Sequence, residues 1–324
     1  MTQKFKVLVT RKWPKPVEKV LKDNFDVTLN SEDIPLSEDE LINAINNYDA
    51  LLPTVTDVIS DKIISSEGRK AKIIANFGVG FNNIDIESAK KNGVVVTNTP
   101  EVLTDCTADI AMLLMLGVSR RCSEGEYHVR KSEWTGWRPT HMMGTKVTSK
   151  TIGLIGMGRI AQAVAHKSHF GFNMNIIFYD PYFKNDEIIS KYKAQPCNSI
   201  EEVLKNSDYV SLHCPSTNET KGLIDYDALS KMKKTAYLIN TARGDIVVEE
   251  DLVKALEDGI IRGAGLDVYE IEPKVNPSLL KFKNVFLLPH LGSATEETRE
   301  AMGMRVYDNI SSFFQGKEPS DRVV

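Results

Sequence analysis

The sequence lacks the features that mark several classes of protein. Its longest apolar run, residues 110–118, is too short to cross a bilayer. The N-terminal stretch MTQKFKVLVTRKWPKP has no signal-peptide core, because its apolar run breaks at Thr10. No CxxC pair occurs among the four cysteines, so we expect neither a metal site nor a disulfide framework: Cys106, Cys122, Cys197 and Cys214. These absences predict a soluble, cytoplasmic protein with reduced thiols.

An excess of charge of one sign is also missing. Lys and Arg number 40 against 44 Asp and Glu, which gives a net charge of -4. This balance argues against binding to nucleic acid or to an anionic membrane. With 42% hydrophobic and 26% charged residues, the chain has the composition of a globular protein. Its 324 residues suggest two domains, although no repeat, low-complexity segment or Pro/Gly/Ser linker marks a boundary.

What the sequence does contain is a regular alternation of short β-type runs with amphipathic helical segments. The runs fall into two series, before residue 100 and after residue 150: FKVLVT, DALLPT, KIIANF and GVVVTNT, then TIGLIG, NIIFYD, DYVSLH, YLINT, GAGLDVY and NVFLLPH. Strands that alternate with helices form parallel sheets with helices on both faces. The sequence therefore predicts an α/β fold with two parallel sheets.

Helix boundaries and connecting segments support this division. Capping boxes are expected at Ser37 with Glu40 and at Ser199 with Glu202, and Gly259 is placed to end a helix. We predict a long, mostly apolar helix over residues 101–119 that carries the chain from one sheet to the other. Residues 120–148 have little periodicity and are expected to form a functional or interface arm. A C-terminal helix is expected to pack back on the first domain.

A glycine turn at 151–168, TIGLIGMGRIAQAVAHKS, is the strongest functional motif. Gly156, Gly158 and Ala161 match G-x-G-x-x-[G/A] between a predicted strand and a predicted helix. Such a turn places a pyrophosphate at the positive end of the following helix. Asp180 ends the next strand, where its carboxylate can accept hydrogen bonds from ribose hydroxyls and repel a 2′-phosphate. The motif predicts a dinucleotide site that favours NAD, with NADP as the alternative.

Three further strand ends carry chemically active side chains. Arg243 follows YLINTA, Glu272 follows GLDVYEI, and His290 follows VFLLP. Taken singly, each has a structural explanation: a salt bridge, a surface charge or a loop histidine. Together they are expected at the carboxyl edge of one parallel sheet, beside the dinucleotide turn.

Nicotinamide chemistry accounts for all three. Arg243 can hold the carboxylate of a 2-oxo acid and polarise its carbonyl group. His290 can donate a proton to the developing alkoxide and remove it in the reverse direction. Glu272 can bond the other imidazole nitrogen, hold the ring and favour its charged form.

The four motifs that carry these residues resemble those of a known family. GLIGMGRIA, YLINTARGD, GLDVYEIEP and LPHLGSAT occur in the order found in D-isomer-specific 2-hydroxyacid dehydrogenases, and the resemblance covers essentially the whole sequence. SEWTGWRP is most similar to the glyoxylate/hydroxypyruvate reductases of that family. The resemblance implies a Rossmann-type coenzyme domain at 100–289 and a flavodoxin-like substrate domain formed by 1–99 and 290–324. It also implies reduction of small 2-oxo acids to D-2-hydroxy acids.

The resemblance implies roles for more residues. It assigns catalysis to Arg243, Glu272 and His290, and carboxylate binding to the backbone amides of Val79 and Gly80. It predicts a homodimer formed through the coenzyme domain, in which Trp137 reaches into the partner's site. It places these residues around the coenzyme: Thr107, Gly156, Gly158, Arg159, Ile160, Asp180, Cys214, Pro215, Thr241, Ala242, Asp267, His290 and Gly292.

The sequence is compatible with alternatives of two kinds. Within the family, the chain could be a D-lactate-type or a D-3-phosphoglycerate-type dehydrogenase. In a different class, an NAD-sensing transcriptional corepressor shares the fold and can keep the same three residues. Animal reductases of the subgroup carry a basic, NADP-favouring stretch where this chain has YDPYFK, and the carboxylate of Asp180 leads us to favour NAD.

Overall fold

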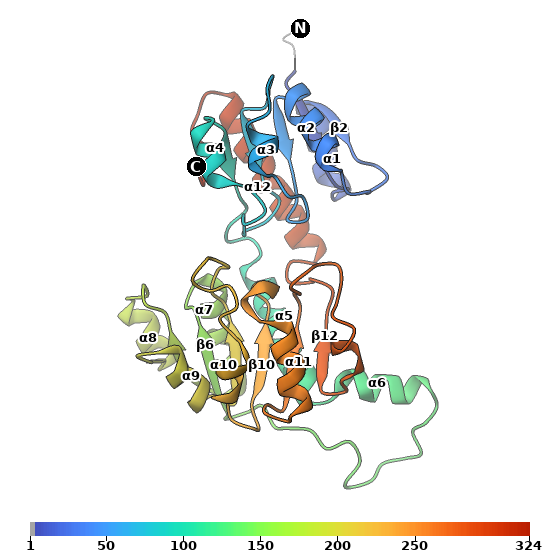
Figure 1. The fold of residues 1–324 in the computed structure, drawn as a ribbon, viewed down its shortest axis with the longest axis vertical. Helices are drawn as coiled ribbons and strands as arrows, with labels where there is room; N and C mark the ends of the chain where they lie inside the picture. Colours follow the sequence, from blue (N-terminus) through green and yellow to red (C-terminus); the bar gives the residue numbers. More distant parts are fainter. Residues whose placement is uncertain (1–3) are drawn as a thin grey trace. The chain divides into compact units, whose positions relative to one another are not determined.

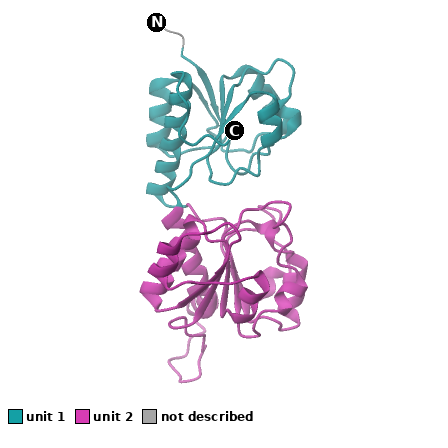
Figure 2. Ribbon diagram, turned by 90° about the vertical axis from the view of Figure 1, so that its left-hand side faces the viewer, with its two compact units in different colours: residues 1–103, 294–324 teal, residues 104–293 magenta. Residues whose placement is uncertain are grey.

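The computed structural model describes residues 4–324. The chain divides into two compact units (Figure 2): unit 1 comprises the residues up to 103 together with 294–324, and unit 2 comprises 104–293. The boundaries between the units fall after residues 103 and 293, whereas the sequence placed them after residues 99 and 289. No helix within the described residues is long and apolar enough to cross a membrane.

Unit 1 is built on a five-stranded parallel sheet of order β2-β1-β3-β4-β5 (Figure 1). Its strands are β1 (Lys6–Val9), β2 (Asp26–Leu29), β3 (Ala50–Leu52), β4 (Ile73–Ala75) and β5 (Val95–Thr97). Its helices are α1 (Lys15–Asn24), α2 (Glu38–Asn47), α3 (Asp61–Ile64), α4 (Ile86–Lys91) and α12 (Glu296–Phe314). The strand order reverses between β1 and β3, which is where flavodoxin-like sheets bind ligands.

Apolar side chains explain how the helices of unit 1 are held. One core cluster combines strand residues with the buried faces of α2, α3 and α4, including Leu41, Ile45 and Ile63. α1 and α12 pack closely, because a Cβ at Gly303 would lie 2.7 Å from a methyl group of Val17. The predicted C-terminal helix therefore packs on the first sheet's unit, as expected.

Unit 2 is built on a seven-stranded parallel sheet of order β12-β11-β10-β9-β6-β7-β8. Its strands are β6 (Thr151–Ile155), β7 (Asn175–Tyr179), β8 (Gln195–Pro196), β9 (Tyr209–Leu212), β10 (Tyr237–Asn240), β11 (Gly263–Leu266) and β12 (Val285–Leu287). Its α-helices are α5 (Thr104–Ser119), α6 (Cys122–Arg130), α7 (Arg159–His166), α8 (Asp186–Tyr192), α9 (Ile200–Asn206), α10 (Tyr226–Ser230) and α11 (Glu249–Glu257). Shorter turns are the π-helix η1 (Lys167–Gly171) and the 3-10 helices η2 (Gly244–Ile246) and η3 (Leu279–Lys281).

Two hydrophobic clusters cover the two faces of this sheet. One joins α5 and α7 to the strands, and the other joins α9, α10 and α11 to them. α5 lies directly on β11, since a Cβ at Gly265 would be 2.9 Å from that of Leu114. The strand order reverses between β6 and β9, so the loops after these two strands open the crevice in which Rossmann-type sheets bind dinucleotides.

The predicted α/β fold with two doubly wound parallel sheets is confirmed, and every predicted strand forms. β2 and β8 were not predicted. Ser37 and Glu40 form a complete capping box. At the second site Ser199 accepts from the amide of Glu202, but the Glu202 carboxylate bonds the amide of Asn198, so the predicted box is incomplete. The arm contains α6, a helix that was not predicted because none of its residues is buried.

Candidate active site

The glycine turn connects β6 to α7 at the strand-order reversal of unit 2. Gly156 has φ +90°, and a Cβ there would lie 2.9 Å from the amide nitrogen of Cys214 and the carbonyl of His213. Glycine is therefore required both by the backbone conformation and by the close approach of the β9 loop. Gly158 caps α7 and has open space above it, whereas Ala161 is fully buried against the sheet. The turn leaves room for a phosphate group at the start of α7, whose first two residues are Arg159 and Ile160.

Asp180 stands beside this turn, directly after β7. One carboxylate oxygen accepts from the amide of Met157 at 2.8 Å, and the other accepts from the amide of Tyr182 at 2.9 Å. These two bonds fix the carboxylate next to the turn. Each carboxylate oxygen keeps a further lone pair, so the group can also accept hydrogen bonds from ribose hydroxyls.

Glu272 and His290 meet at the carboxyl edge of the same sheet. The Nδ1 atom of His290 lies 2.8 Å from Oε2 of Glu272, and the two side chains are 33% and 30% exposed. The other carboxylate oxygen accepts from the amide of Tyr269 at 3.2 Å. The imidazole is thus held by one nitrogen, which leaves Nε2 available for a proton-transfer role.

Arg243 follows β10 on the same edge. Burial lowers the pKa of Arg243, while the nearby charges of Glu272 and Asp245 raise it, with burial the larger effect. Burial would raise the pKa of Glu272, but the hydrogen bond and charge of His290, the amide of Tyr269 and the charge of Arg243 together hold it below its ordinary value. Arg243 is therefore close enough to influence the acidic partner of His290.

The loop that carries His290 is held by Asp267, which is almost fully buried at the end of β11. Its carboxylate accepts from the amides of Leu291 at 2.6 Å and Gly292 at 2.8 Å, and its carbonyl accepts from the amide of His290. Thr107 of α5 donates to the carbonyl of Gly292 at 2.9 Å. His290 has φ +55°, an uncommon conformation for a residue other than glycine, and these bonds maintain it.

Two residues that the sequence did not indicate hold the Arg243 loop. The side-chain amide of Asn240, fully buried, donates to the carbonyl of Arg243 at 2.8 Å and accepts from the amide of Ala242 at 3.0 Å. Gly244 packs on the loop after β11, because a Cβ there would fall 1.8 Å from the carbonyl carbon of Tyr269. The pattern that could have indicated both residues is an asparagine at the end of a buried strand with Arg-Gly beginning three residues later.

The remaining coenzyme candidates of unit 2 end β9 and β10. Cys214 and Pro215 follow β9, and burial raises the pKa of the Cys214 thiol to about 11, so it is protonated and unreactive. Thr241 follows β10, and its hydroxyl is buried with no partner among residues 4–324. A buried hydroxyl without a described partner, on the same sheet edge as the glycine turn, fits a coenzyme that supplies the missing contact.

Three predicted residues lie elsewhere. Val79 and Gly80 belong to unit 1, in the loop after β4. Trp137 is 82% exposed in the arm of unit 2. The two ends of this arm, at residues 121–124 and 143–144, line a cavity of about 390 Å³. Tyr237, the first residue of β10, and Asn284, the residue before β12, line the same cavity. The arm therefore leaves unit 2 at the amino edge of its sheet, and Trp137 does not join Arg243, Glu272 and His290 within one chain.

Comparison with known proteins identifies one family. Residues 112–292 match the family model described as D-isomer specific 2-hydroxyacid dehydrogenase, NAD binding domain. Glyoxylate reductase from Pyrococcus horikoshii is 43% identical over 321 residues, which cover 97% of this chain and 94% of that protein. Glyoxylate reductase from Thermococcus litoralis is also 43% identical, over 98% of this chain and 96% of that protein.

A solved structure is similar over the full length. NADPH-dependent glyoxylate/hydroxypyruvate reductase from Sinorhizobium meliloti, in complex with NADP and malonate, has a TM-score of 0.86 and 30% identity, and the match covers 99% of this chain and 97% of that one. The motifs, the two parallel sheets and these similarities agree. The protein is an NAD(P)-dependent oxidoreductase that belongs to the D-isomer specific 2-hydroxyacid dehydrogenase family.

Proposed function

We propose that the protein reduces a small 2-oxo acid of the glyoxylate or hydroxypyruvate type to the D-2-hydroxy acid. The observation that carries this proposal is the 2.8 Å pair of His290 and Glu272, which lies with Arg243 on the sheet edge that also holds the glycine turn. The relatives named glyoxylate reductase support the choice of substrate class.

Each of the three side chains has a defined task in this reaction. A bound nicotinamide coenzyme supplies the hydride for C2 of the 2-oxo acid. The guanidinium of Arg243 binds the carboxylate and draws electron density toward the carbonyl oxygen. Nε2 of His290 donates the proton that the developing alkoxide takes up, and removes it when the hydroxy acid is oxidised. Glu272 favours the imidazolium form and fixes the ring through Nδ1.

Val79 and Gly80 are proposed to bind the substrate carboxylate through their backbone amides. Among the described residues neither amide has a hydrogen-bond acceptor, whereas the carbonyls of both residues accept a hydrogen bond. Two adjacent backbone amides without an acceptor can together bind an anion. Unit 1 would therefore supply substrate binding and unit 2 coenzyme binding and catalysis.

The coenzyme is proposed to be NAD. The carboxylate of Asp180 is fixed beside the glycine turn by two backbone amides, where it would bind the ribose hydroxyls and repel a 2′-phosphate. The pyrophosphate would contact Gly156, Gly158, Arg159 and Ile160. The nicotinamide end would lie near Thr241 and Asp267, with the remaining predicted coenzyme residues around it: Thr107, Cys214, Pro215, Ala242, His290 and Gly292.

We propose a cytoplasmic homodimer formed through unit 2. The arm exposes large apolar side chains that a single chain leaves in water: Tyr127, Val129, Trp134, Trp137 and Met143. Exposed apolar groups that cluster on one segment indicate an interaction surface. Trp137 would then approach the active site of the partner. The four free cysteines agree with a reducing compartment.

One assay tests the proposal. The protein is mixed with NADH or NADPH and with glyoxylate, hydroxypyruvate, pyruvate or phosphohydroxypyruvate, and coenzyme oxidation is followed by absorbance. Rapid turnover of glyoxylate or hydroxypyruvate, with formation of the D-hydroxy acid, is expected. Faster turnover of pyruvate or of the phosphorylated acid would change the substrate class. Tight NADH binding without turnover of any of the four would refute the enzymatic role and favour a coenzyme-sensing protein.

A further inference from the structure

The loop that follows β4 is unusual in how its carbonyl groups are bonded. Three consecutive carbonyls, those of Gly78, Val79 and Gly80, each accept a hydrogen bond from inside unit 1. The donors are the amide of Thr99 at 3.0 Å, the side-chain amide of Asn98 at 2.8 Å and the side-chain amide of Asn76 at 2.9 Å. The carbonyl of one residue and the amide of the next point in opposite directions, so drawing the carbonyls of Gly78 and Val79 inward turns the amides of Val79 and Gly80 outward. The bond to the Gly80 carbonyl holds the end of this segment in place.

A third asparagine connects the same loop to its neighbour. The side-chain amide of Asn83 donates to the side-chain oxygen of Asn76 at 3.3 Å. It also donates to the carbonyls of Thr54 at 3.1 Å and Asp57 at 3.0 Å, in the loop after β3. Asn76 is fully buried, and both polar ends of its side chain are bonded within the loop: its amide donates to the Gly80 carbonyl, and its oxygen accepts from Asn83.

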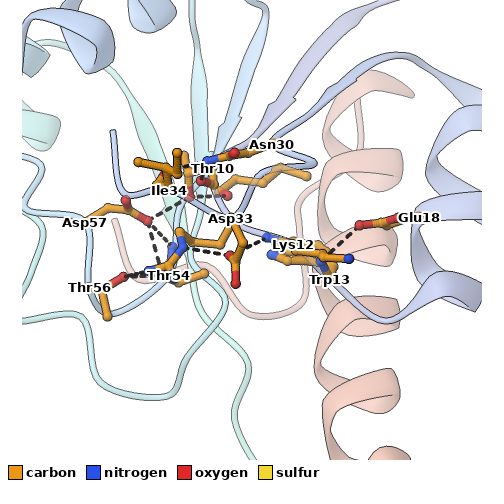
Figure 3. Close-up of polar contacts among 12 residues, drawn as sticks. Thr10, Lys12, Trp13, Glu18, Asn30, Asp33, Ile34, Thr54, Thr56 and Asp57 are labelled. Atoms are coloured by element: carbon orange, nitrogen blue, oxygen red, sulfur yellow. Dashed lines mark hydrogen bonds and ion pairs between the residues drawn. The ribbon is translucent and has the colours of Figure 1, made fainter. Parts of the chain in front are cut away.

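The loop after β3 is itself fixed by a buried carboxylate. Asp57 is 3% exposed and accepts from the hydroxyl of Thr10 at 2.7 Å and from the amide of Thr54 at 2.7 Å. Figure 3 shows Thr10, Thr54 and Asp57 converging at the carboxyl ends of β1 and β3. Asn83, and Asn76 through it, are therefore anchored to a part of the sheet edge that cannot shift without breaking several buried bonds.

We propose that three asparagines are positioning residues for the substrate carboxylate: Asn98 aims the amide of Gly80, beside that of Val79, at the carboxylate, and Asn76 and Asn83 hold the loop that carries both amides. None of the three needs to touch the substrate, because each acts through the backbone. This inference rests on the proposed function, in which those two amides bind the carboxylate. It adds that substrate affinity, more than the rate of hydride transfer, depends on neutral side-chain amides in unit 1.

Asn98→Asp is the most direct test, because it replaces the N–H donor to the Val79 carbonyl with an oxygen of nearly the same size. The carbonyl then loses its donor and faces a negative charge, so the loop turns and the two amides leave their position. We expect KM for glyoxylate or hydroxypyruvate to rise about tenfold or more, with kcat within about threefold of the parent. The dissociation constant of oxamate from the protein–NADH complex, measured by calorimetry, should rise by a similar factor, while that of NADH stays unchanged.

Asn92→Asp is the matched control. Its side-chain amide also donates to a backbone carbonyl, that of Ser88 at 2.9 Å, but it lies before β5, at the opposite edge of the sheet from Asn98. Asn98→Ala removes the donor without adding charge and should give a smaller rise in KM in the same direction. Equal KM and oxamate affinity in the Asn98 and Asn92 variants would overturn the inference while leaving the proposed function intact. An inactive parent protein would instead refute the proposed function.

Discussion

Glu272→Gln removes the charge of Glu272 but keeps the shape of the side chain, and we expect it to reduce activity. The carboxylate contacts Nδ1 of His290 at 2.8 Å and also accepts from the amide of Tyr269. Glutamine keeps the size of the side chain and can still accept from Nδ1–H. It carries no charge, so it no longer favours the imidazolium that donates the proton during reduction.

The size of the effect follows from this contact. A hydrogen bond to a charged group contributes about 1.5–3 kcal/mol and one to a neutral group about 0.5–1.5 kcal/mol, so the loss for this partly exposed pair is about 1–1.5 kcal/mol. Since each 1.36 kcal/mol is a tenfold change in rate, kcat/KM for reduction should fall about 5- to 10-fold. The alkaline limb of its pH profile should also move to lower pH, because the carboxylate charge that favours the protonated imidazole is gone.

Steady-state oxidation of NADH by the preferred 2-oxo acid, measured from pH 5 to pH 9, checks both expectations. Glu270→Gln removes the same charge two residues away, from an exposed side chain, and should behave like the parent. The dissociation constant of NADH should be the same in all three proteins. A Glu272→Gln enzyme with parental kcat/KM and an unshifted pH profile would refute the acid/base role of the pair.

Three further outcomes are expected. Gly244→Ala should lower kcat/KM about 100-fold while NADH affinity changes less than threefold, because a Cβ placed 1.8 Å from the Tyr269 carbonyl carbon must separate the loops of Arg243 and Glu272; unchanged kinetics would refute that coupling. Asp180→Ser should improve kcat/KM with NADPH relative to NADH at least tenfold, and an unaltered ratio would contradict the role of the carboxylate. Burial lowers the pKa of His213 to about 4, so on acidification the imidazole is protonated in the unfolded chain before it is protonated in the folded one. The free energy of unfolding should therefore fall as pH drops from about 6.5 to 4, by at most roughly 3 kcal/mol. Urea unfolding at pH 7 and pH 4.5 measures that loss, and His213→Gln should show less of it.

Much of the fold could be predicted because the strands of a parallel sheet are buried on both faces and appear as continuous apolar runs. β10, for example, is buried along its whole length. β2 was missed because its residues are only partly buried, and β8 because it has two residues, one of them a proline. α6 was missed because it packs no face against the core, so its apolar residues follow no helical period.

The candidate site was predictable to the extent that it depends on topology. All carboxyl ends of a parallel sheet meet at one edge, so Arg243, Glu272 and His290 could be grouped from their positions after strands. The contacts that hold them could not be predicted, because they join segments that are distant in the sequence. Thr107 bonds Gly292 across 185 positions, and the inward bonds of Asp267 depend on the left-handed conformation of His290.

Unit 1 combines the first part of the chain with the last, residues 294–324, and this affects the order in which it can fold during synthesis. Its edge strand β5 receives a second partner from residues 321–324: Val96 donates to the carbonyl of Val324 at 3.1 Å, and Val323 donates to that of Val96 at 2.7 Å. During synthesis on the ribosome these residues, and α12 with them, emerge only after all of unit 2. The first hundred residues therefore wait with an open strand edge and without the helix that packs beside α1, and unpaired strand edges favour edge-to-edge aggregation.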